Sequence, residues 1–383
     1  MKRSWKVLIM LDKGFIEKTA RDIAGIKEKP VTINKLKGDA SNRSYYRIKF
    51  SRDTQQCAPA NQDTMILMEL AEPEAFKKSE EKISVSTMPV TELPYINILN
   101  HLAKCNVGVP RLFHYEKEKG LLFLEDLGDM LLEERVKGSS STGCKDYYKK
   151  AIDELIKIHT CATKTDDKDC IAFGRGFDIP LLMWEFDHFI EYGIPVCPMS
   201  ADRQGTGRED ARGMKIPEND RKAMMDIFYS ISDKLAKEPR VFTHRDYHSR
   251  NLMIHNDKIR VLDFQDALMG PCQYDLASFL RDSYIALPED MIDELLEYYI
   301  SKKEAVDGIK INRKNFRELF DLMSIQRNLK AAGRFAYINS VKKKDFYLQF
   351  IPQTLGYVKR NLKKYSGLKE LHKLLSKYVE ELR

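Results

Sequence analysis

The ten residues Phe242–Asn251, with the sequence FTHRDYHSRN, contain two histidines, two arginines, one aspartate and one asparagine. The aspartate, Asp246, could accept a proton from a hydroxyl group that attacks phosphorus. Asn251 and the later Asp263 offer oxygen ligands suited to Mg²⁺, a hard ion that takes one or two protein ligands and keeps several waters. The spacing H-R-D-x-x-x-x-N, followed by an apolar run and a second aspartate, is typical of phosphotransferases.

A predicted hairpin would bring the two candidate metal ligands together. Two short apolar runs, Leu252–Ile254 and Ile259–Leu262, predict strands, and the Asn256-Asp257 pair between them favours a tight turn. Antiparallel pairing of these runs places Asn251 and Asp263 at the same, open end of the hairpin. The sequence therefore predicts a metal site at that end.

The sequence gives little support for zinc or for disulfides. His244 and His248 have the spacing H-x-D-x-H, but zinc sites use three or four protein ligands, and no second cluster of histidine or cysteine lies nearby in the sequence. The seven cysteines are scattered and include no Cys-x-x-Cys pair, as expected for reduced thiols in a cytoplasm. We therefore expect His244 to hold the loop and not a metal.

The composition of the 383 residues is typical of a globular protein. Hydrophobic residues make up 43% and charged residues 32% of the chain, and no apolar run approaches the roughly 18 residues of a membrane helix. The first residues lack an adequate signal core, which predicts a cytoplasmic location and no membrane partner. The net charge of +7 is concentrated after residue 301, where basic and apolar residues alternate at helical spacing. This pattern favours a solvated helical face over a nucleic-acid partner. The sequence leaves the oligomeric state open and favours a monomer.

The elements that must position these residues change in type along the chain. Residues 31–125 contain short runs such as TINKLKG, SYYRIKF, TMILMEL and GLLFLED, which predict a small sheet accompanied by one helix. After Glu125 the apolar residues recur at helical spacing. We therefore predict an α+β, bilobal fold with an antiparallel-sheet lobe over residues 1–125 and a larger, mainly helical lobe over residues 126–383.

Four stretches resemble a known group of enzymes: LKGDASNRSYYRI, HRDYHSRNLM, LDFQDALMGPCQYDLASFLRDSY and FDLMSIQRNLKAAGRFA. From about Leu36 to Tyr365 the chain is similar to bacterial kinases of the aminoglycoside-phosphotransferase-like superfamily. Within it, the chain most resembles the anomeric sugar kinases that act on N-acetylmuramate and N-acetylglucosamine. The resemblance implies a protein-kinase-like fold, ATP with Mg²⁺, and phosphoryl transfer to the C1 hydroxyl of an amino sugar in cell-wall recycling.

By this resemblance Asp246 is the catalytic base, while Asn251 and Asp263 hold Mg²⁺. The stretch GDASNR takes the place of a glycine-rich phosphate loop between the first two strands. Its residues are Gly38, Asp39, Ala40, Ser41, Asn42 and Arg43. Glu125 and Leu127 belong to the implied hinge, whose backbone groups pair with adenine; a simple linker between the lobes is the alternative interpretation.

The sequence departs from the wider superfamily at its third predicted strand. That strand should carry a lysine for the α- and β-phosphates, yet TMILMEL has Met65 and Met68 and no lysine. The sugar-kinase branch is similar in having methionine there. Arg47, which shares a face of the second predicted strand with Lys49, is a candidate for the missing cation, and so is Arg43.

Four further residues have expected roles near the site. Asp275 is expected to cap or brace the helix after the metal loop, and His159 matches an Ile/Leu-His signature that packs beneath the catalytic loop. Glu185 and Asp187, in MWEFDHFIEYGIP, could meet the sugar, although their spacing also suits an ordinary amphipathic helix.

Three functional hypotheses follow. The first is an ATP-dependent kinase of an amino sugar, most readily at its anomeric hydroxyl. The second is a small-molecule kinase of the aminoglycoside or choline type. The third is a catalytically silent ATP-binding scaffold, which the missing lysine motivates and the presence of Asp246, Asn251 and Asp263 argues against.

Overall fold

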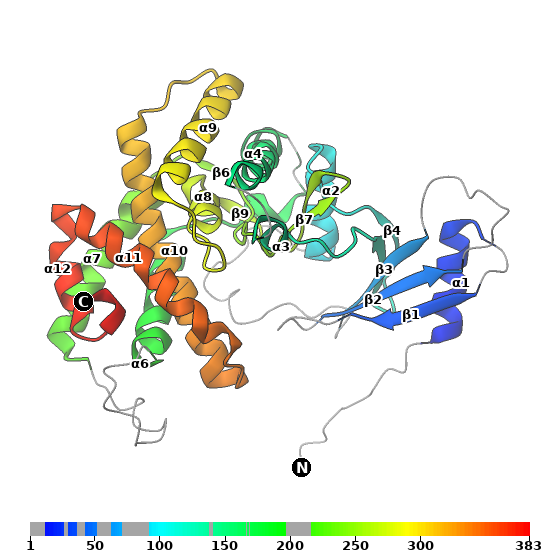
Figure 1. Cartoon of the computed structure of the whole chain (residues 1–383), viewed down its shortest axis with the longest axis horizontal. Helices are drawn as coiled ribbons and strands as arrows, with labels where there is room; N and C mark the ends of the chain where they lie inside the picture. Colours follow the sequence, from blue (N-terminus) through cyan, green and yellow to red (C-terminus); the bar gives the residue numbers. More distant parts are fainter. Residues whose placement is uncertain are drawn as a thin grey trace, which may run out of the picture. The chain divides into compact units, whose positions relative to one another are not determined.

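A computed structural model describes residues 12–26, 30–36, 43–51, 63–70, 92–137, 141–165, 167, 169–196 and 216–383. These residues form two compact units. The first contains the described residues up to 70 together with Pro110–Gly128, and the second contains residues 92–109 together with Asp129–Arg383 (Figure 1). The predicted phosphate-loop residues Gly38, Asp39, Ala40, Ser41 and Asn42 lie outside the described residues.

The first unit is a five-stranded antiparallel sheet with one helix packed on it (Figure 1). The strand order is β1-β2-β3-β5-β4, with β1 (Val31–Lys35), β2 (Arg43–Phe50), β3 (Thr64–Leu70), β4 (Leu112–Glu116) and β5 (Leu121–Glu125). Helix α1 (Lys13–Ala24) begins where the Asp12 carboxylate accepts a hydrogen bond from the Phe15 amide at 3.0 Å. The helix buries Ile16 and Ala20 against the sheet, so this unit has its own core.

The alternation predicted for the second strand is confirmed in β2. Ile48 and Phe50 are buried in the core beneath α1, while Lys49 is exposed on the other face. Arg47 pairs with Ile66 in the middle of the sheet and therefore lies on the face that α1 does not cover. In β3, Met65 is fully buried in the core.

The second unit is mainly helical. Its α-helices are α2 (Pro94–Lys104), α3 (Leu132–Lys137), α4 (Ser141–Lys157), α5 (Ile179–His188), α6 (Ile194–Val196), α7 (Glu218–Ala236), α8 (Gln273–Leu280), α9 (Glu289–Asp307), α10 (Arg313–Lys342), α11 (Ile351–Lys364) and α12 (Lys369–Ser376). Its π- and 3-10 helices are η1 (Ile158–Ala162), η2 (Ile171–Gly174), η3 (Phe189–Gly193), η6 (Phe346–Phe350), η7 (Ser366–Leu368) and η8 (Glu380–Leu382). The long helix α10 runs through the middle and packs against α5, α8 and α11 (Figure 1). It approaches η3 so closely at Gly333 that a Cβ there would lie 2.8 Å from the Cα of Phe189.

Two short β-ribbons complete the second unit. Strand β6 (Arg240–Thr243) pairs with β9 (Leu268–Pro271), and β7 (Leu252–His255) pairs with β8 (Lys258–Val261). The predicted hairpin is therefore confirmed. The turn residues Asn256 and Asp257 have φ of 51° and 60°, the left-handed conformation that a two-residue hairpin turn requires.

The division into units differs from the expected single boundary after Glu125, because α2 belongs with the helical unit. The side chain of Asn97 donates to the Asp169 carbonyl at 2.8 Å and accepts from the Ile171 amide at 2.9 Å. On the same helix, the His101 ring is hydrogen-bonded to the Ala162 carbonyl at 2.8 Å. These long-range contacts, which local sequence patterns do not reveal, tie the helix to η1 and η2.

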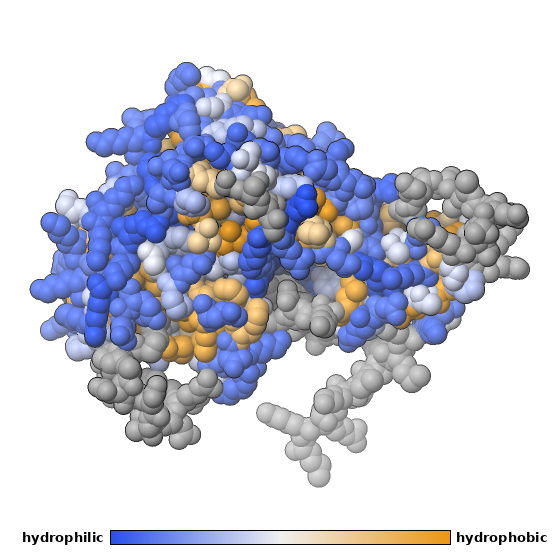
Figure 2. Space-filling model, viewed as in Figure 1, coloured by the Kyte–Doolittle hydropathy of each residue, from blue (hydrophilic) through white to orange (hydrophobic). Residues whose placement is uncertain are grey.

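The surface agrees with the composition. Among the described residues, no helix combines the length and the apolar character that crossing a membrane requires. Figure 2 shows a mostly hydrophilic face in which apolar side chains form scattered patches. The cysteines within the described ranges, Cys105, Cys144, Cys161, Cys170 and Cys272, are free thiols.

Candidate active site

The segment that carries Asp246 is held in place by the buried carboxylate of Asp275. Asp275, in the first turn of α8, is fully buried and accepts hydrogen bonds from the amides of His244 and Arg245 at 2.7 and 2.9 Å. Arg245 has φ of 79°, a conformation that costs a non-glycine residue about 1–3 kcal/mol unless its surroundings enforce it. Asp275 supplies that enforcement. It braces the loop and does not cap the helix, so the expectation that it serves α8 was wrong.

His159 anchors Asp275, as expected of a residue beneath the catalytic loop. Its Nε2 lies 3.1 Å from the Asp275 carboxylate and its Nδ1 lies 2.7 Å from the Tyr299 hydroxyl. Burial lowers the pKa of His159 more than the Asp275 carboxylate raises it. The ring is therefore neutral, with Nε2–H donating to Asp275 and Nδ1 accepting from Tyr299. Because η1 is π-helical at this point, the side chain is set by a local irregularity in the helix that continues α4.

His244 holds the loop from the other side. Its Nδ1 accepts a hydrogen bond from the Asp246 amide at 3.2 Å, which requires that Nε2 donate to the Leu262 carbonyl, 2.8 Å away. The ring thus links the backbone of Asp246 to the backbone of Leu262, the residue before Asp263. The structural role expected for His244 is confirmed.

The hairpin brings the predicted metal ligands to one end, as its register requires. The Leu262 amide donates to the Asn251 carbonyl at 2.9 Å, so the segment that ends in Asp263 lies beside Asn251. The Asn251 amide nitrogen donates to the Asp246 carbonyl at 2.9 Å, which fixes the orientation of the side chain and leaves its oxygen as the group able to bind a cation. Asp263 has φ of 58° and accepts a hydrogen bond from Gln265.

This donor set fits Mg²⁺. One carboxylate and one amide oxygen are the hard ligands that Mg²⁺ takes when substrate phosphates and waters complete its shell. Across the described part of the chain, no group of three or more His, Cys, Asp or Glu side chains could hold a metal ion. The arrangement therefore lacks the features of a dedicated all-protein metal cage and suits an ion that arrives with a nucleotide.

Two cations on α10 approach the Asp246 carboxylate. Arg327 Nη2 lies 3.3 Å and Lys330 Nζ lies 3.9 Å from Asp246 Oδ1. Burial by itself would raise the pKa of Asp246, but the charges of Lys330, Arg327 and their neighbours outweigh it and hold the pKa well below its usual range. The carboxylate therefore stays ionised, and because its side chain is 32% exposed it can be reached.

Sequence reasoning did not assign roles to Arg327 and Lys330. Both lie in the stretch FDLMSIQRNLKAAGRFA that carries the family resemblance, and their spacing of three residues places them on one face of a helix. Neither the resemblance nor the spacing says which residue that face contacts. Their separation from Asp246 by about eighty positions is bridged only when α10 packs beside α8.

Of the two tentative sugar-binding residues, the structure brings one close to Asp246. Glu185 is fully buried in α5, accepts a hydrogen bond from Gln326 at 2.8 Å, and lies 3.8 Å from Lys330 Nζ. Lys330 therefore connects Glu185 with Asp246. Asp187 instead forms an ion pair with Arg221 of α7 at 2.7 Å and is 40% exposed, away from that cluster.

The remaining predicted residues lie in the first unit. Arg47 forms a two-pronged ion pair with Asp126, with distances of 2.7 and 3.1 Å, and also donates to the Gly128 carbonyl. Leu127, which lies between Asp126 and Gly128 in the sequence, is buried. The Glu125 carboxylate accepts a hydrogen bond from the Arg111 amide at 3.1 Å. Arg43 begins β2 opposite Leu70. Arg47 thus orders the segment that the resemblance identifies as a hinge.

Comparisons with known proteins agree with this geometry. Residues 32–309 match the family described as "Phosphotransferase enzyme family". The N-acetylmuramate/N-acetylglucosamine kinase of Neisseria meningitidis is 31% identical over 72% of this chain and 78% of its own, and that of Pseudomonas aeruginosa is 30% identical over 74% and 77%. The choline kinase of Cryptosporidium parvum superposes with a TM-score of 0.58 at 13% identity, covering 95% of this chain and all of the other. This likeness confirms the predicted fold class.

Proposed function

The chain belongs to the phosphotransferase enzyme family, and we propose that it transfers the γ-phosphoryl group of ATP to the anomeric hydroxyl of an amino sugar, N-acetylmuramate or N-acetylglucosamine. The observation that carries the proposal is the arrangement of Asp246 beside the open end of a hairpin that presents Asn251 and Asp263. The names of the relatives from Neisseria and Pseudomonas support the choice of sugar.

Asp246 serves in this proposal to orient the acceptor hydroxyl and to take its proton late in the reaction. A carboxylate with a lowered pKa is a weak base, so it does not remove a proton from an unreacted alcohol. The proton becomes acidic only as the oxygen–phosphorus bond forms, and an anomeric hydroxyl is more acidic than an ordinary alcohol from the start. Arg327 and Lys330 keep Asp246 ionised and ready to accept a hydrogen bond.

Asn251 and Asp263 would hold Mg²⁺, which neutralises charge on the transferring phosphoryl group when it is bound. The protein's own contribution is to fix these two ligands before the nucleotide arrives. The hydrogen bond from Asn251 to the Asp246 carbonyl couples the metal ligand to the residue that positions the acceptor. Both functions of the loop therefore depend on the same short segment.

The charges near Asp246 favour a neutral or anionic acceptor over a cationic one. The side chains that approach the carboxylates of Asp246 and Glu185 are cationic, namely Arg245, Arg327 and Lys330. A polyamine such as an aminoglycoside, or a choline-like cation, would meet like charges here. This observation weighs against the second hypothesis, and it is compatible with an N-acetylated sugar.

The proposal also assigns nucleotide contacts to the first unit. They involve the loop residues Gly38 to Arg43, the cation of Arg47, and the backbone of Glu125 and Leu127. The placement of Arg47 in mid-sheet, on the face opposite α1, supports its candidacy as the substitute for the missing lysine. With ATP bound, the Arg47 guanidinium would donate to both Asp126 and a phosphate group, because it has five N–H donors.

The test is ADP release with ATP and Mg²⁺ on the two sugars and on their 1-O-methyl glycosides. Turnover on the free sugars alone, abolished in Asp246→Asn, is the expected result. Equal turnover on the glycosides would refute the anomeric position. Binding of ATP without turnover on either sugar or on choline or aminoglycosides would favour the scaffold instead.

A further inference from the structure

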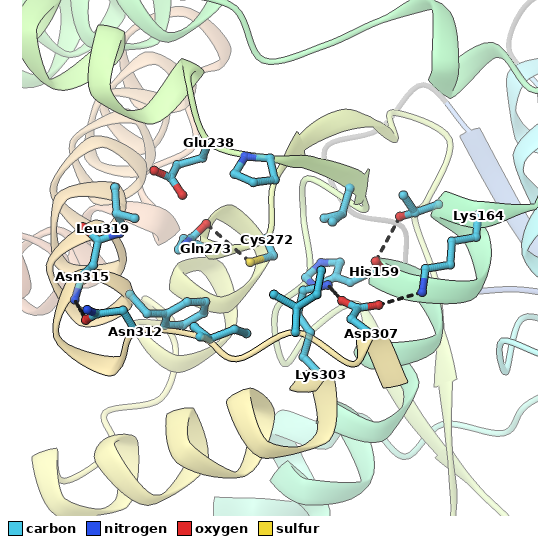
Figure 3. Close-up of a pocket in the computed structure, with 16 residues that line it drawn as sticks. His159, Lys164, Glu238, Cys272, Gln273, Lys303, Asp307, Asn312, Asn315 and Leu319 are labelled. Atoms are coloured by element: carbon cyan, nitrogen blue, oxygen red, sulfur yellow. Dashed lines mark hydrogen bonds and ion pairs between the residues drawn. The ribbon is translucent and has the colours of Figure 1, made fainter. Parts of the chain in front are cut away.

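A cavity lies in the helical unit and is lined in part by His159, which anchors the brace of the catalytic loop. Its volume is about 520 Å³, within the range of small-molecule sites. The cavity is bounded by the end of α7, the start of α8, the connection between α9 and α10, and η1 (Figure 3).

The walls of this cavity are mostly apolar. Val241, Phe316 and Leu319 are buried residues that line it, and Ile309, 69% exposed, belongs to the same lining. An apolar ligand that covers this exposed isoleucine removes its side chain from water, which favours binding. The shape and lining therefore suit a compact apolar body.

The lysines of the cavity already have partners. Lys164 and Lys303 each form an ion pair with Asp307 at 2.8 Å, and these three residues lie together along one wall (Figure 3). Asp307 thus pairs with both lysines, and neither ammonium group on this wall is without an ion-pair partner.

Glu238 is the exception among the charged residues of the lining. It faces the cavity from the end of α7, and among the described residues its carboxylate has no hydrogen-bond or ion-pair partner (Figure 3). The lysines of the last turn are engaged elsewhere, Lys234 with Glu318 and Lys237 with Asp233. The carbonyl end of a helix also disfavours a carboxylate. Burial raises the pKa of Glu238, and the charge of Lys234 offsets this effect only in part.

We propose that this cavity binds a small amine carried on an apolar body, with the ammonium group donating to Glu238 and the body packing against Val241, Phe316 and Leu319. A charged hydrogen bond at a half-buried carboxylate supplies the specificity. The site goes beyond the proposed kinase reaction, because it is separate from Asp246 and its occupancy can be measured without turnover.

The experiment is isothermal titration calorimetry of the full chain with 2-phenylethylamine, 2-phenylethanol and 3-phenylpropionate, which share a phenyl body and differ in charge. The amine is expected to bind about 10-fold or more tightly than the alcohol, and the anion not at all, since a hydrogen bond to a charged group contributes that much. Absence of heat with the amine, or equal binding of the anion, overturns the proposal.

Substitutions in the cavity test whether the amine binds there. Glu238→Gln is expected to reduce the affinity for the amine to that for the alcohol, while Glu370→Gln, at an exposed carboxylate of α12, leaves both unchanged. Asn315→Trp fills the cavity from an exposed position of α10 and is expected to abolish binding of both ligands. Unchanged amine affinity in either Glu238→Gln or Asn315→Trp would show that the ligand binds elsewhere and would refute the assignment.

Discussion

Replacing Asp275 by asparagine tests whether the catalytic loop is held in place by one carboxylate. Asp275 accepts hydrogen bonds from His244, Arg245 and His159, at 2.7, 2.9 and 3.1 Å. Asparagine keeps one acceptor oxygen and turns the other position into an NH₂ donor. That donor must face either the Arg245 amide or both the His244 amide and the donating Nε2 of His159.

The expected loss of unfolding free energy is about 2.5–6 kcal/mol. One hydrogen bond to a charged group contributes about 1.5–3 kcal/mol, and a buried donor left without an acceptor costs about 1–3 kcal/mol. The strained φ of Arg245 would relax once its amide is released, which moves Asp246. A displacement of about 1 Å at the reacting groups costs on the order of 100-fold in rate.

Calorimetry and ADP release measure the two consequences. We expect a Tm lowered by several degrees and a kcat lowered at least ~10-fold. Asp187→Asn is the matched control, because Asp187 makes a partly exposed ion pair worth about 0–1 kcal/mol outside the site. If Asp275→Asn keeps wild-type kcat and Tm, the brace has no role and the reasoning fails.

Four other outcomes are expected. Lys330→Met removes a charge that lowers the pKa of Asp246, so the acidic limb of the kcat/KM profile should move to higher pH; an unmoved limb would contradict the electrostatic role. Arg47→Met should weaken ATP binding by about 10-fold or more, while Lys49→Met, exposed on the same strand, should not; calorimetry with ATP distinguishes them, and equal affinities would remove Arg47 from the phosphate site. Chelation of Mg²⁺ should abolish turnover and its return should restore it, whereas Asp263→Asn should need more Mg²⁺ for half-maximal rate; turnover in excess chelator would refute the metal assignment. Hydrogen bonds from Arg313 and from the Ile311 amide lower the pKa of Glu304 to about 2, so its stabilising effect is full above the unfolded pKa near 4.5 and fades as pH falls toward 2. In acid titrations the stability gap between wild type and Glu304→Gln should therefore narrow as pH falls from 5 to 3, and a constant gap would show that Glu304 does not titrate as described.

The local parts of the site follow from the sequence. The β7–β8 hairpin depends on two apolar runs and a turn pair whose side chains tolerate positive φ, and all of these lie within twelve residues. The same holds for the alternation of β2, which is set by which residues avoid water. Such features are short-range, so a pattern in one window is enough to predict them.

The environment of Asp246 was decided by tertiary structure. Arg327 and Lys330 meet it only because α10 packs against α8, and Asp275 reaches the catalytic loop only because α8 starts beneath it. Glu185 and Asp187 are two residues apart in one helix, yet one is buried in this cluster and the other pairs with α7. A sequence gives the types and spacing of such groups. Which groups meet is settled by long-range packing of apolar faces. The lowered pKa of Asp246 results from that packing, and so does the position of Glu238, whose carboxylate has no partner among the described residues.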